Sequence, residues 1–321
     1  MRRSGLFALV GIVSVVLAWT AMRGSHTTPT TPPAHAIAAP AAKPPITPPP
    51  APEPVAPPPR RVVIISEDGM RPDVLDGDRT PRHVALMREG EIAHRAHTIP
   101  ESDTLPSHAS MLSGVGAAAH GLWWNSYQPS RGYIHVPTIF SIAHAHGLTT
   151  AMFVGKPKLK HIAIPGTVDH FERPGYLCGS VARRAAAFFR ATPPDLMFVH
   201  FSDPDEYGHS HGWMSPEYLR AVAASDRCLA TVLDAIDEPA TRADTLVIVT
   251  ADHGGHGKHH SGGVAEVDRD IPWIVRGPGV APGGEIEGAV ATTDTAVTAL
   301  AALGLPRTPE MKGRSPVTFA R

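Results

Sequence analysis

The chain has 321 residues, of which 42% are hydrophobic and 18% are charged, so most of it can bury a core. Its 29 Lys and Arg side chains nearly balance 30 Asp and Glu side chains, which leaves a formal net charge of -1. We therefore expect no general nucleic-acid-binding surface, because such a surface needs an excess of basic residues.

The N-terminal segment, residues 1–24, is predicted to be a signal peptide or a membrane anchor. Arginines near the start precede an uncharged run over residues 5–22, which suits either a secretory signal or a short membrane span. Small residues are poorly placed for a signal peptidase after this run, which favours an uncleaved anchor. In both cases we expect export, so the protein would be periplasmic, membrane-anchored or secreted.

Residues 25–60 are rich in Pro, Ala and Thr, and this composition favours a solvated, disordered linker over packed structure. The linker either acts as a stalk or is a low-complexity insert without a spacing role. Folding is expected to begin near Arg60, so residues 61–321 are predicted to form one domain.

Alternating strand and helix patterns fill this domain. Short apolar runs predict buried parallel strands at residues 62–65, 196–199, 246–249 and 271–275. Helices are predicted at residues 81–89, 106–112, 137–146, 181–190, 216–236 and 293–303. The alternation indicates an α/β fold with a doubly wound, mostly parallel central sheet and helices on both faces. Ligands bind such sheets at the carboxyl ends of the strands.

Side chains that can bind a metal ion follow three of the predicted strands. Carboxylates and imidazoles are common ligands of zinc. Asp205 and His209 are four residues apart, which lets both grip one ion from a single turn, whereas Asp68 and Gly69 alone would indicate an ordinary turn. The candidates are Asp68, Asp203, Asp205, His209, Asp252 and His253.

Histidines also cluster in the segment that follows the third of these strands. Asp252 and His253 are adjacent, so on an extended segment their side chains would diverge and serve two neighbouring ions or one ion and its surroundings. His256, His259 and His260 are further imidazoles, which either act as ligands or form a flexible loop that binds metal weakly.

Thr104 is a candidate nucleophile. It shortly precedes Pro106, which suits the first turn of a helix, so free backbone N–H groups would face Thr104 and any anion beside it. The other interpretation is that Thr104 only caps the helix. A bound divalent metal would favour the nucleophile, because the ion activates a coordinated hydroxyl that is otherwise almost inert.

The two cysteines, Cys178 and Cys228, could form a disulfide if the chain is exported. Nothing in their spacing pairs them, and Cys228 would equally suit a buried thiol in a predicted helix. The sequence leaves both possibilities open.

The order of the motifs resembles that of the alkaline phosphatase superfamily, and specifically its nucleotide pyrophosphatase/phosphodiesterase branch. The shared motifs are Asp68 to Asp73, Thr104 to His108, His120 to Asn125, Pro204 to His209 and Asp252 to Gly254, and the resemblance runs from about Arg61 to the C-terminus. Glu67 departs from it, because an apolar residue is more usual before the first motif. The resemblance implies an alkaline phosphatase-like catalytic domain over residues 61–321.

The resemblance further implies two zinc ions. One would be held by Asp68, Thr104, Asp252 and His253, and the other by Asp205, His209 and a late histidine. Relatives carry that histidine shortly before a segment such as Ile271 to Ile274, which favours His260 over His259. Asn125 matches a residue that donates a hydrogen bond to a phosphoryl oxygen.

The implied reaction is hydrolysis of a small phosphate ester or nucleotide, with phosphodiesters or nucleotide pyrophosphates as the favoured class. Thr104 would attack phosphorus, and water would hydrolyse the resulting phosphothreonine. Because Asn125 is neutral and Lys156 and Lys158 are expected to face solvent, a singly charged diester is favoured over a monoester. The alternative is that Lys156 or Lys158 folds over the site and supplies the positive charge that a monoester needs.

Several rival functions fit the same residues. A phosphomonoesterase and a phosphonate hydrolase are the rivals within the superfamily, whereas a sulfatase would carry Cys or Ser in place of Thr104. The rival from another class is a catalytically silent metal-binding module on a stalk.

Overall fold

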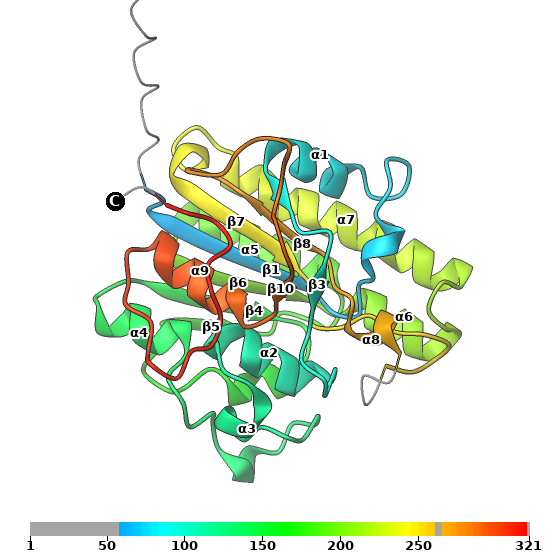
Figure 1. Ribbon diagram of the computed structural model, residues 1–321, viewed down its shortest axis with the longest axis horizontal. Helices are drawn as coiled ribbons and strands as arrows, with labels where there is room; N and C mark the ends of the chain where they lie inside the picture. The colour runs from blue at the N-terminus through cyan, green and yellow to red at the C-terminus, as the bar shows by residue number, and fades with distance from the viewer. Residues whose placement is uncertain (1–57, 261–264, 320–321) are drawn as a thin grey trace, which may run out of the picture. The chain divides into compact units, whose positions relative to one another are not determined.

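An eight-stranded sheet runs through the part of the chain that the computed structural model describes, residues 58–260 and 265–319 (Figure 1). Its strand order is β5-β4-β6-β1-β7-β8-β2-β9, and a separate small sheet pairs β10 with β3. The strands are β1 (Arg61–Glu67), β2 (Glu91–Ile92), β3 (Ala96–His97), β4 (Thr150–Val154), β5 (His170–Glu172), β6 (Leu196–Phe201), β7 (Thr245–Thr250), β8 (Trp273–Arg276), β9 (Gly284–Glu285) and β10 (Val290–Ala291).

β1 lies in the middle of the sheet and is parallel to its neighbours β6 and β7, and β4 is parallel to β6. The strand predicted at residues 271–275 forms as β8 but is antiparallel to β7, so its predicted parallel direction is wrong. A parallel return needs a crossover connection, usually a helix packed on the sheet. The only helix among the described residues between Thr250 and Trp273 is the short α8 (Glu266–Arg269). β8 therefore starts at the edge where β7 ends.

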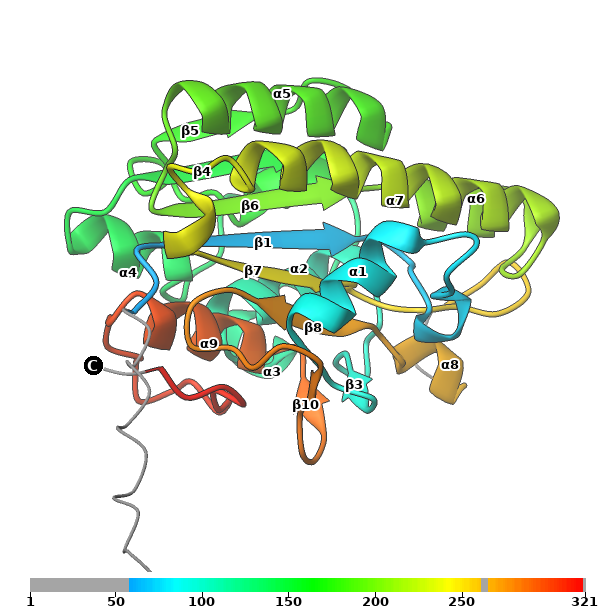
Figure 2. The ribbon, with the colours of Figure 1, turned by 90° about the horizontal axis from the view of Figure 1, so that it is seen from above.

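Helices cover both faces of the sheet, which confirms the predicted fold class (Figure 2). Helices α1, α5 and α7 pack on one face, and α2, α4 and α9 pack on the other. Every predicted helix occurs, whereas α3, α6 and α8 were not predicted. The helices are α1 (Pro81–Glu89), α2 (Thr104–Ser113), α3 (Ala117–His120), α4 (Ile139–Ala145), α5 (Cys178–Ala191), α6 (Asp203–His211), α7 (Pro216–Ile236), α8 and α9 (Asp294–Ala302).

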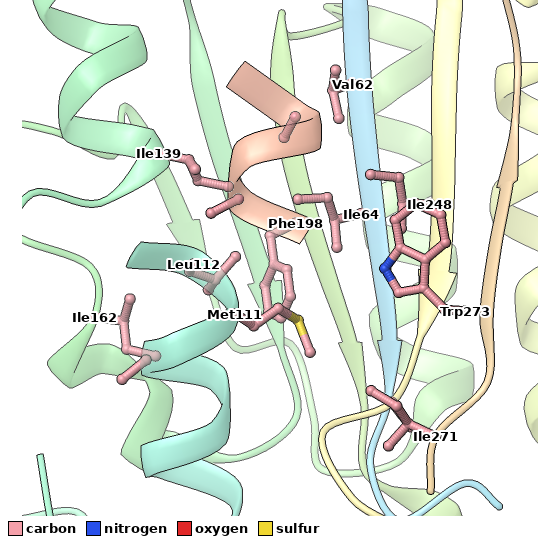
Figure 3. Close-up of a cluster of buried hydrophobic side chains, with 14 of the residues drawn as sticks. Val62, Ile64, Met111, Leu112, Ile139, Ile162, Phe198, Ile248, Ile271 and Trp273 are labelled. Atoms are coloured by element: carbon pink, nitrogen blue, oxygen red, sulfur yellow. The ribbon is translucent and has the colours of Figure 1, made fainter. Parts of the chain in front are cut away.

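Side chains of β1 alternate between two hydrophobic cores. Val62 and Ile64 face the core beneath α2 and α9, where Leu112 also packs, and Figure 3 shows these three side chains together. Val63 and Ile65 face the core beneath α5 and α7. Because helices bury both faces, β1 is a continuous apolar run, and this is why the sequence predicts it as a buried strand.

Local signals explain which helix starts were predictable. Ser215 caps α7 by accepting a hydrogen bond from the first turn, and Pro216 follows it, so the start of α7 agrees with the prediction. The segment after β6 was expected to form a single turn but is a nine-residue helix, α6. Its acidic first turn, which includes Asp203 and Glu206, complements the positive end of the helix dipole.

The predictions for the N-terminus concern residues that are almost all outside the described part. This holds for the signal or anchor over residues 1–24 and for the linker at residues 25–60 except its last three residues. Among the described residues, no helix combines the length and the apolar character needed to span a bilayer.

Cys178 and Cys228 form a disulfide between α5 and α7, with their Cα atoms 5.9 Å apart. This decides between the two possibilities that the sequence left open, and the interpretation of Cys228 as a free buried thiol is wrong. The bond adds a covalent link to the layer formed by these two helices.

Glu67 ends β1 with its side chain fully buried against α1 and α7. His83 Nε2 donates to one Glu67 carboxylate oxygen at 2.5 Å, and Ser225 Oγ donates to the other at 2.6 Å. His83 Nδ1 donates to Asp226 at 2.7 Å, so the ring donates from both nitrogens and is protonated. Burial lowers the pKa of His83, but the charges of Glu67 and Asp226 outweigh it and raise the pKa to about 9.

We expect the stability difference between the wild type and His83→Gln to shrink as pH rises. Because the folded-state pKa of His83 is raised to about 9, its contribution is complete below its unfolded pKa of about 6.5 and is lost as pH rises through about 9. The loss corresponds to as much as about 3 kcal/mol of unfolding free energy. Urea unfolding of both proteins between about pH 6 and pH 10 measures the difference. A difference that does not change with pH would contradict a protonated His83.

Candidate active site

The predicted ligands gather at the carboxyl ends of β1, β6 and β7, which point the same way (Figure 2). Asp68 directly follows β1, and Asp252 and His253 lie just past β7. Asp205 and His209 lie on α6, which starts just after β6. The parallel strands therefore bring residues from three distant parts of the sequence to one edge.

Gly69 allows α6 to approach the end of β1. Its φ is +71°, a conformation that favours glycine, and the neighbouring Asp205 N–H donates to the Asp68 carbonyl at 2.9 Å. A Cβ on Gly69 would lie 2.9 Å from the Asp205 Cα, too close for any other residue without movement of the backbone.

A first group of candidate ligands consists of Asp68, Asp252 and His253, whose ligand atoms all lie within 4.8 Å of one another. His253 Nε2 is 3.3 Å from Asp68 Oδ1 and 3.4 Å from Asp252 Oδ2. All three side chains are fully buried. Asp252 and His253 thus converge on one point, although an extended segment would have separated them.

A second group consists of Asp205, His209 and His260, again with ligand atoms within 4.8 Å of one another. The Nε2 atoms of His209 and His260 are 3.0 Å apart, and Asp205 Oδ1 is 3.3 and 3.6 Å from them. His260 is buried in this group, whereas His256 and His259 are exposed. The geometry therefore agrees with the preference for His260 over His259.

The three imidazoles of these groups are oriented in the same way. In each, Nδ1 is bonded to a backbone carbonyl: His253 to Gly254 at 2.8 Å, His260 to Ser102 at 2.7 Å and His209 to Lys258 at 3.0 Å. A neutral ring that donates from Nδ1 carries its lone pair on Nε2. In the neutral rings the lone pairs would therefore face the carboxylates, an arrangement that suits a cation between them.

Several buried ligand atoms have no hydrogen-bond partner, which is costly unless an ion satisfies them. They are Asp68 Oδ1, Asp205 Oδ1, Asp252 Oδ2 and His253 Nε2. Burial lowers the pKa of His253, but the charges of Asp252 and Asp68 outweigh burial and raise it to about 10. The carboxylates thus attract a positive charge to this point, and the donor set of nitrogen and oxygen atoms fits a divalent metal such as zinc.

Lys156 lies inside the site, so the prediction that it faces solvent is wrong. Its side chain is 4% exposed, and its ammonium contacts Asp68 at 2.7 Å and also binds Asp205. It lies 3.4 Å from the Thr104 hydroxyl. Burial lowers the pKa of Lys156, but the two carboxylates outweigh it and raise the pKa. Lys156 follows β4, an unpredicted strand that ends at the same edge as β6.

Lys158 also points to the site, which corrects the prediction that it faces solvent. Its ammonium donates to Asn125 Oδ1 at 2.9 Å, and that oxygen also accepts the Leu105 N–H at the start of α2. Asn125 Nδ2 donates to Asp103 at 3.3 Å. A cavity of about 320 Å³ opens here, lined by residues that include Thr104, Asn125, Lys156, Lys158, Tyr176 and His260.

Thr104 is the first residue of α2, and Asp103 occupies the N-cap position before it. The interpretation of Thr104 as a helix cap is therefore wrong. Its side chain is buried, and its hydroxyl lies near the Lys156 ammonium at the edge of the cavity. Asp203, the other carboxylate predicted beside β6, lies outside both ligand groups and accepts the Cys178 N–H at 2.6 Å.

His108 and His200, which the sequence analysis did not propose as site residues, contact the candidate ligands. His200 Nε2 is 2.9 Å from Asp68 Oδ2, and His108 Nδ1 is 3.3 Å from Asp252 Oδ2. His108 lies in the second motif, so it could have been proposed from the resemblance. His200 belongs to an apolar strand, and only the pairing of β6 with β1 places it beside Asp68.

Comparison with known proteins finds a matching family model and curated relatives. The model of the type I phosphodiesterase / nucleotide pyrophosphatase family matches residues 62–271, which is more than half of the chain. A 2,3-bisphosphoglycerate-independent phosphoglycerate mutase from Nostoc punctiforme is 28% identical over 65% of this chain and 39% of its own length. Human ectonucleotide pyrophosphatase/phosphodiesterase family member 5 is 23% identical over 61% of this chain and 45% of its own length. The chain thus spans less than half of these curated relatives.

Solved structures share the fold. An inactive variant of murine ectonucleotide pyrophosphatase/phosphodiesterase 5, in complex with AMP, superposes with a TM-score of 0.66 at 15% identity and covers 78% of this chain and 96% of its own. A phosphonate monoester hydrolase from Silicibacter pomeroyi gives a TM-score of 0.60 at 19% identity, with 79% of this chain and 75% of its own covered.

The geometry of the second group predicts that His260→Ala weakens divalent metal binding much more than His259→Ala. His260→Ala removes a buried Nε2 that faces Asp205, whereas the side chain of His259 is exposed and lies outside the group. We expect a loss of at least about tenfold in zinc affinity, measured by competition with a chelating indicator. Equal losses in both variants would mean that His260 is not a ligand.

Proposed function

Because the chain belongs to the type I phosphodiesterase/nucleotide pyrophosphatase family, we propose that it is a zinc-dependent hydrolase of phosphodiesters or nucleotide pyrophosphates. The murine relative forms a complex with AMP, which supports a small nucleotide as the substrate. Residues 61–321 would form the catalytic domain. Family membership does not by itself identify the metal, the substrate or the nucleophile of this chain, and these three are what we propose.

The observation that carries the proposal is the set of unsatisfied ligand atoms beside a helix N-terminus that begins with a hydroxyl residue. The buried carboxylate and imidazole atoms without hydrogen-bond partners belong to both ligand groups. Thr104, the first residue of α2, lies at the cavity that these groups line. A buried hydroxyl, ligand atoms that suit a cation and space for a ligand thus occur together, which supports the proposal.

The two ligand groups would each hold one zinc ion. Asp68, Thr104, Asp252 and His253 would hold one, and Asp205, His209 and His260 would hold the other. When bound, the two ions would stabilise the negative charge that develops on the phosphoryl oxygens during transfer.

Thr104 would attack phosphorus through its hydroxyl oxygen, forming a phosphothreonine that water hydrolyses in the second step. Lys156, 3.4 Å from that hydroxyl, would favour its deprotonated form electrostatically. Asn125 uses one Nδ2 hydrogen on Asp103, so the other remains for a phosphoryl oxygen. The positive end of the α2 dipole would favour the anionic substrate.

We also propose that the protein is exported. Its disulfide supports this, because such bonds persist mainly in oxidising compartments. The uncharged run at residues 5–22 would serve as the signal or the anchor, and residues 25–60 would link it to the catalytic domain.

Thr104→Ala should abolish turnover while leaving the fold intact, because it removes the attacking oxygen but only one of several proposed ligands. We expect kcat/KM for bis(4-nitrophenyl) phosphate to fall at least about a thousandfold. Ser107→Ala is the matched control, because the Ser107 hydroxyl lies on the same helix but accepts a hydrogen bond from the Thr98 hydroxyl at 3.0 Å. Activity of Thr104→Ala within tenfold of the wild type would refute the nucleophile. A zinc-loaded wild type without any turnover would favour a silent metal-binding module.

The position of Lys158 weakens the reason for preferring diesters over monoesters. The preference for diesters was based on a neutral Asn125, but Lys158 adds a positive charge directly to it. We therefore expect Lys158→Ala to lower kcat/KM for 4-nitrophenyl phosphate, which carries two charges, about tenfold more than for bis(4-nitrophenyl) phosphate. Lys160→Ala is the control, because Lys160 belongs to the same short helix (Pro157–His161) but is exposed. Equal losses on both substrates would mean that Lys158 does not meet the second charge.

A further inference from the structure

We propose that His200 is a positioning residue that selects which oxygen of Asp68 faces the metal site and also fixes the turn that carries Lys156. His200 is fully buried on β6 and belongs to neither ligand group. It contacts both Asp68 and the backbone of Gly155. The inference rests on the metal site put forward under the proposed function.

The hydrogen bonds of His200 determine its tautomer. The Gly155 N–H donates to Nδ1 at 3.3 Å, so Nδ1 carries a lone pair and the proton of the neutral ring is on Nε2. Nε2–H therefore donates to Asp68 Oδ2 at 2.9 Å. With both nitrogens engaged, the ring has one orientation, and its donor points at a single carboxylate oxygen.

This donor decides how the Asp68 carboxylate is turned. Oδ2 accepts from His200 and lies 2.7 Å from the Lys156 ammonium. Oδ1 has no hydrogen-bond partner and lies 3.3 Å from His253 Nε2. The carboxylate thus has one satisfied oxygen and one that remains for an ion, and without His200 the only side-chain donor left to Oδ2 among the described residues would be Lys156.

The second hydrogen bond of His200 reaches the turn after β4. Val154 pairs with His200 in the sheet register, and the next residue, Gly155, packs so closely that an added Cβ would lie 2.5 Å from the Tyr176 carbonyl. Lys156 follows directly. One imidazole therefore fixes a proposed ligand and the backbone that carries the buried ammonium beside it.

Burial alone does not account for a histidine at this position. Leu196 and Phe198 precede it at alternate positions on β6 and pack in the hydrophobic core. An apolar residue would continue that core, whereas a buried imidazole must have partners for its polar atoms. His200 has them only because Asp68 and Gly155 lie within reach.

The test measures zinc affinity in the full-length wild type, in His200→Leu, in His200→Gln and in a control variant. A chelating indicator serves as the competitor for zinc. His200→Leu should lower the affinity for one of the two zinc ions at least about tenfold and change the absorption spectrum of the cobalt-substituted protein. His200→Gln should stay within about threefold of the wild type, because its amide can accept from Gly155 and donate to Asp68.

His120→Leu is the matched control. His120 is also buried, its Nδ1 accepts a backbone N–H from Leu122 and its Nε2 lies 3.0 Å from Ser110 Oγ. Substitution there removes the same kind of bonds away from the proposed ligands. We expect it to lower the unfolding free energy without changing zinc affinity or the cobalt spectrum.

The outcomes separate the two proposals. A wild type that binds no zinc would overturn the proposed metal site, and this inference with it. A wild type that binds two ions, with unchanged affinity in His200→Leu, would overturn only the role of His200. An equal loss of affinity in His120→Leu, or in His200→Gln, would also overturn it. If His200→Leu does not fold, His200→Asn provides the comparison with His200→Gln, because its shorter amide cannot reach both partners.

Discussion

Three buried carboxylates at one edge of the sheet, Asp68, Asp205 and Asp252, impose the electrostatic constraint on which the site depends. Like charges repel strongly in the protein interior, where water screens them weakly. Burial and the charge of Asp68 together raise the pKa of Asp252. At Asp68 and Asp205 burial also raises the pKa, but the charge of Lys156 and the contacts of neighbouring histidines together outweigh burial and lower both pKa values. The Lys156 ammonium leaves Asp68 Oδ1, Asp205 Oδ1 and Asp252 Oδ2 without hydrogen-bond partners, and the proposed metal ions would bind at these atoms.

The proposed ligands could be predicted because each motif combines a strand end with the residues just past it. Parallel strands bring such ends together without any need to know the intervening packing. Lys156 could not be predicted in this way, because β4 was not recognised and its position in the sheet was therefore unknown. His200 was missed for a related reason: it ends an apolar run, and only the register of β6 against β1 brings it to Asp68. Local sequence thus indicates the proposed metal ligands better than it indicates the side chains that form hydrogen bonds or ion pairs with them.

Glu67 illustrates a further limit of pattern reading. The alternation along β1 assigns its side chain to a hydrophobic core, yet polar groups from α1 and α7 satisfy it there. Asp226 of α7 also accepts the backbone N–H groups of Arg82 and His83, and so supplies the cap that Thr80 does not provide to α1. These partners are far from Glu67 in the chain, so no local period or spacing reveals them. The network replaces apolar packing with directional bonds at the strand end that leads into Asp68.

The position of α6 depends on contacts at both of its ends. A helix of nine residues is marginal in isolation, because its nucleation cost is high. At its start, Asp203 accepts the backbone N–H of Cys178, which the disulfide to Cys228 ties to α7. Just past its end, the Trp213 indole donates to the Gly69 carbonyl at 2.9 Å, beside the end of β1. The second ligand group is therefore held by the disulfide-linked helix layer on one side and by the central strand on the other. Because both anchors lie outside the motif that carries the ligands, the motif alone specifies which side chains meet but not how firmly they are held.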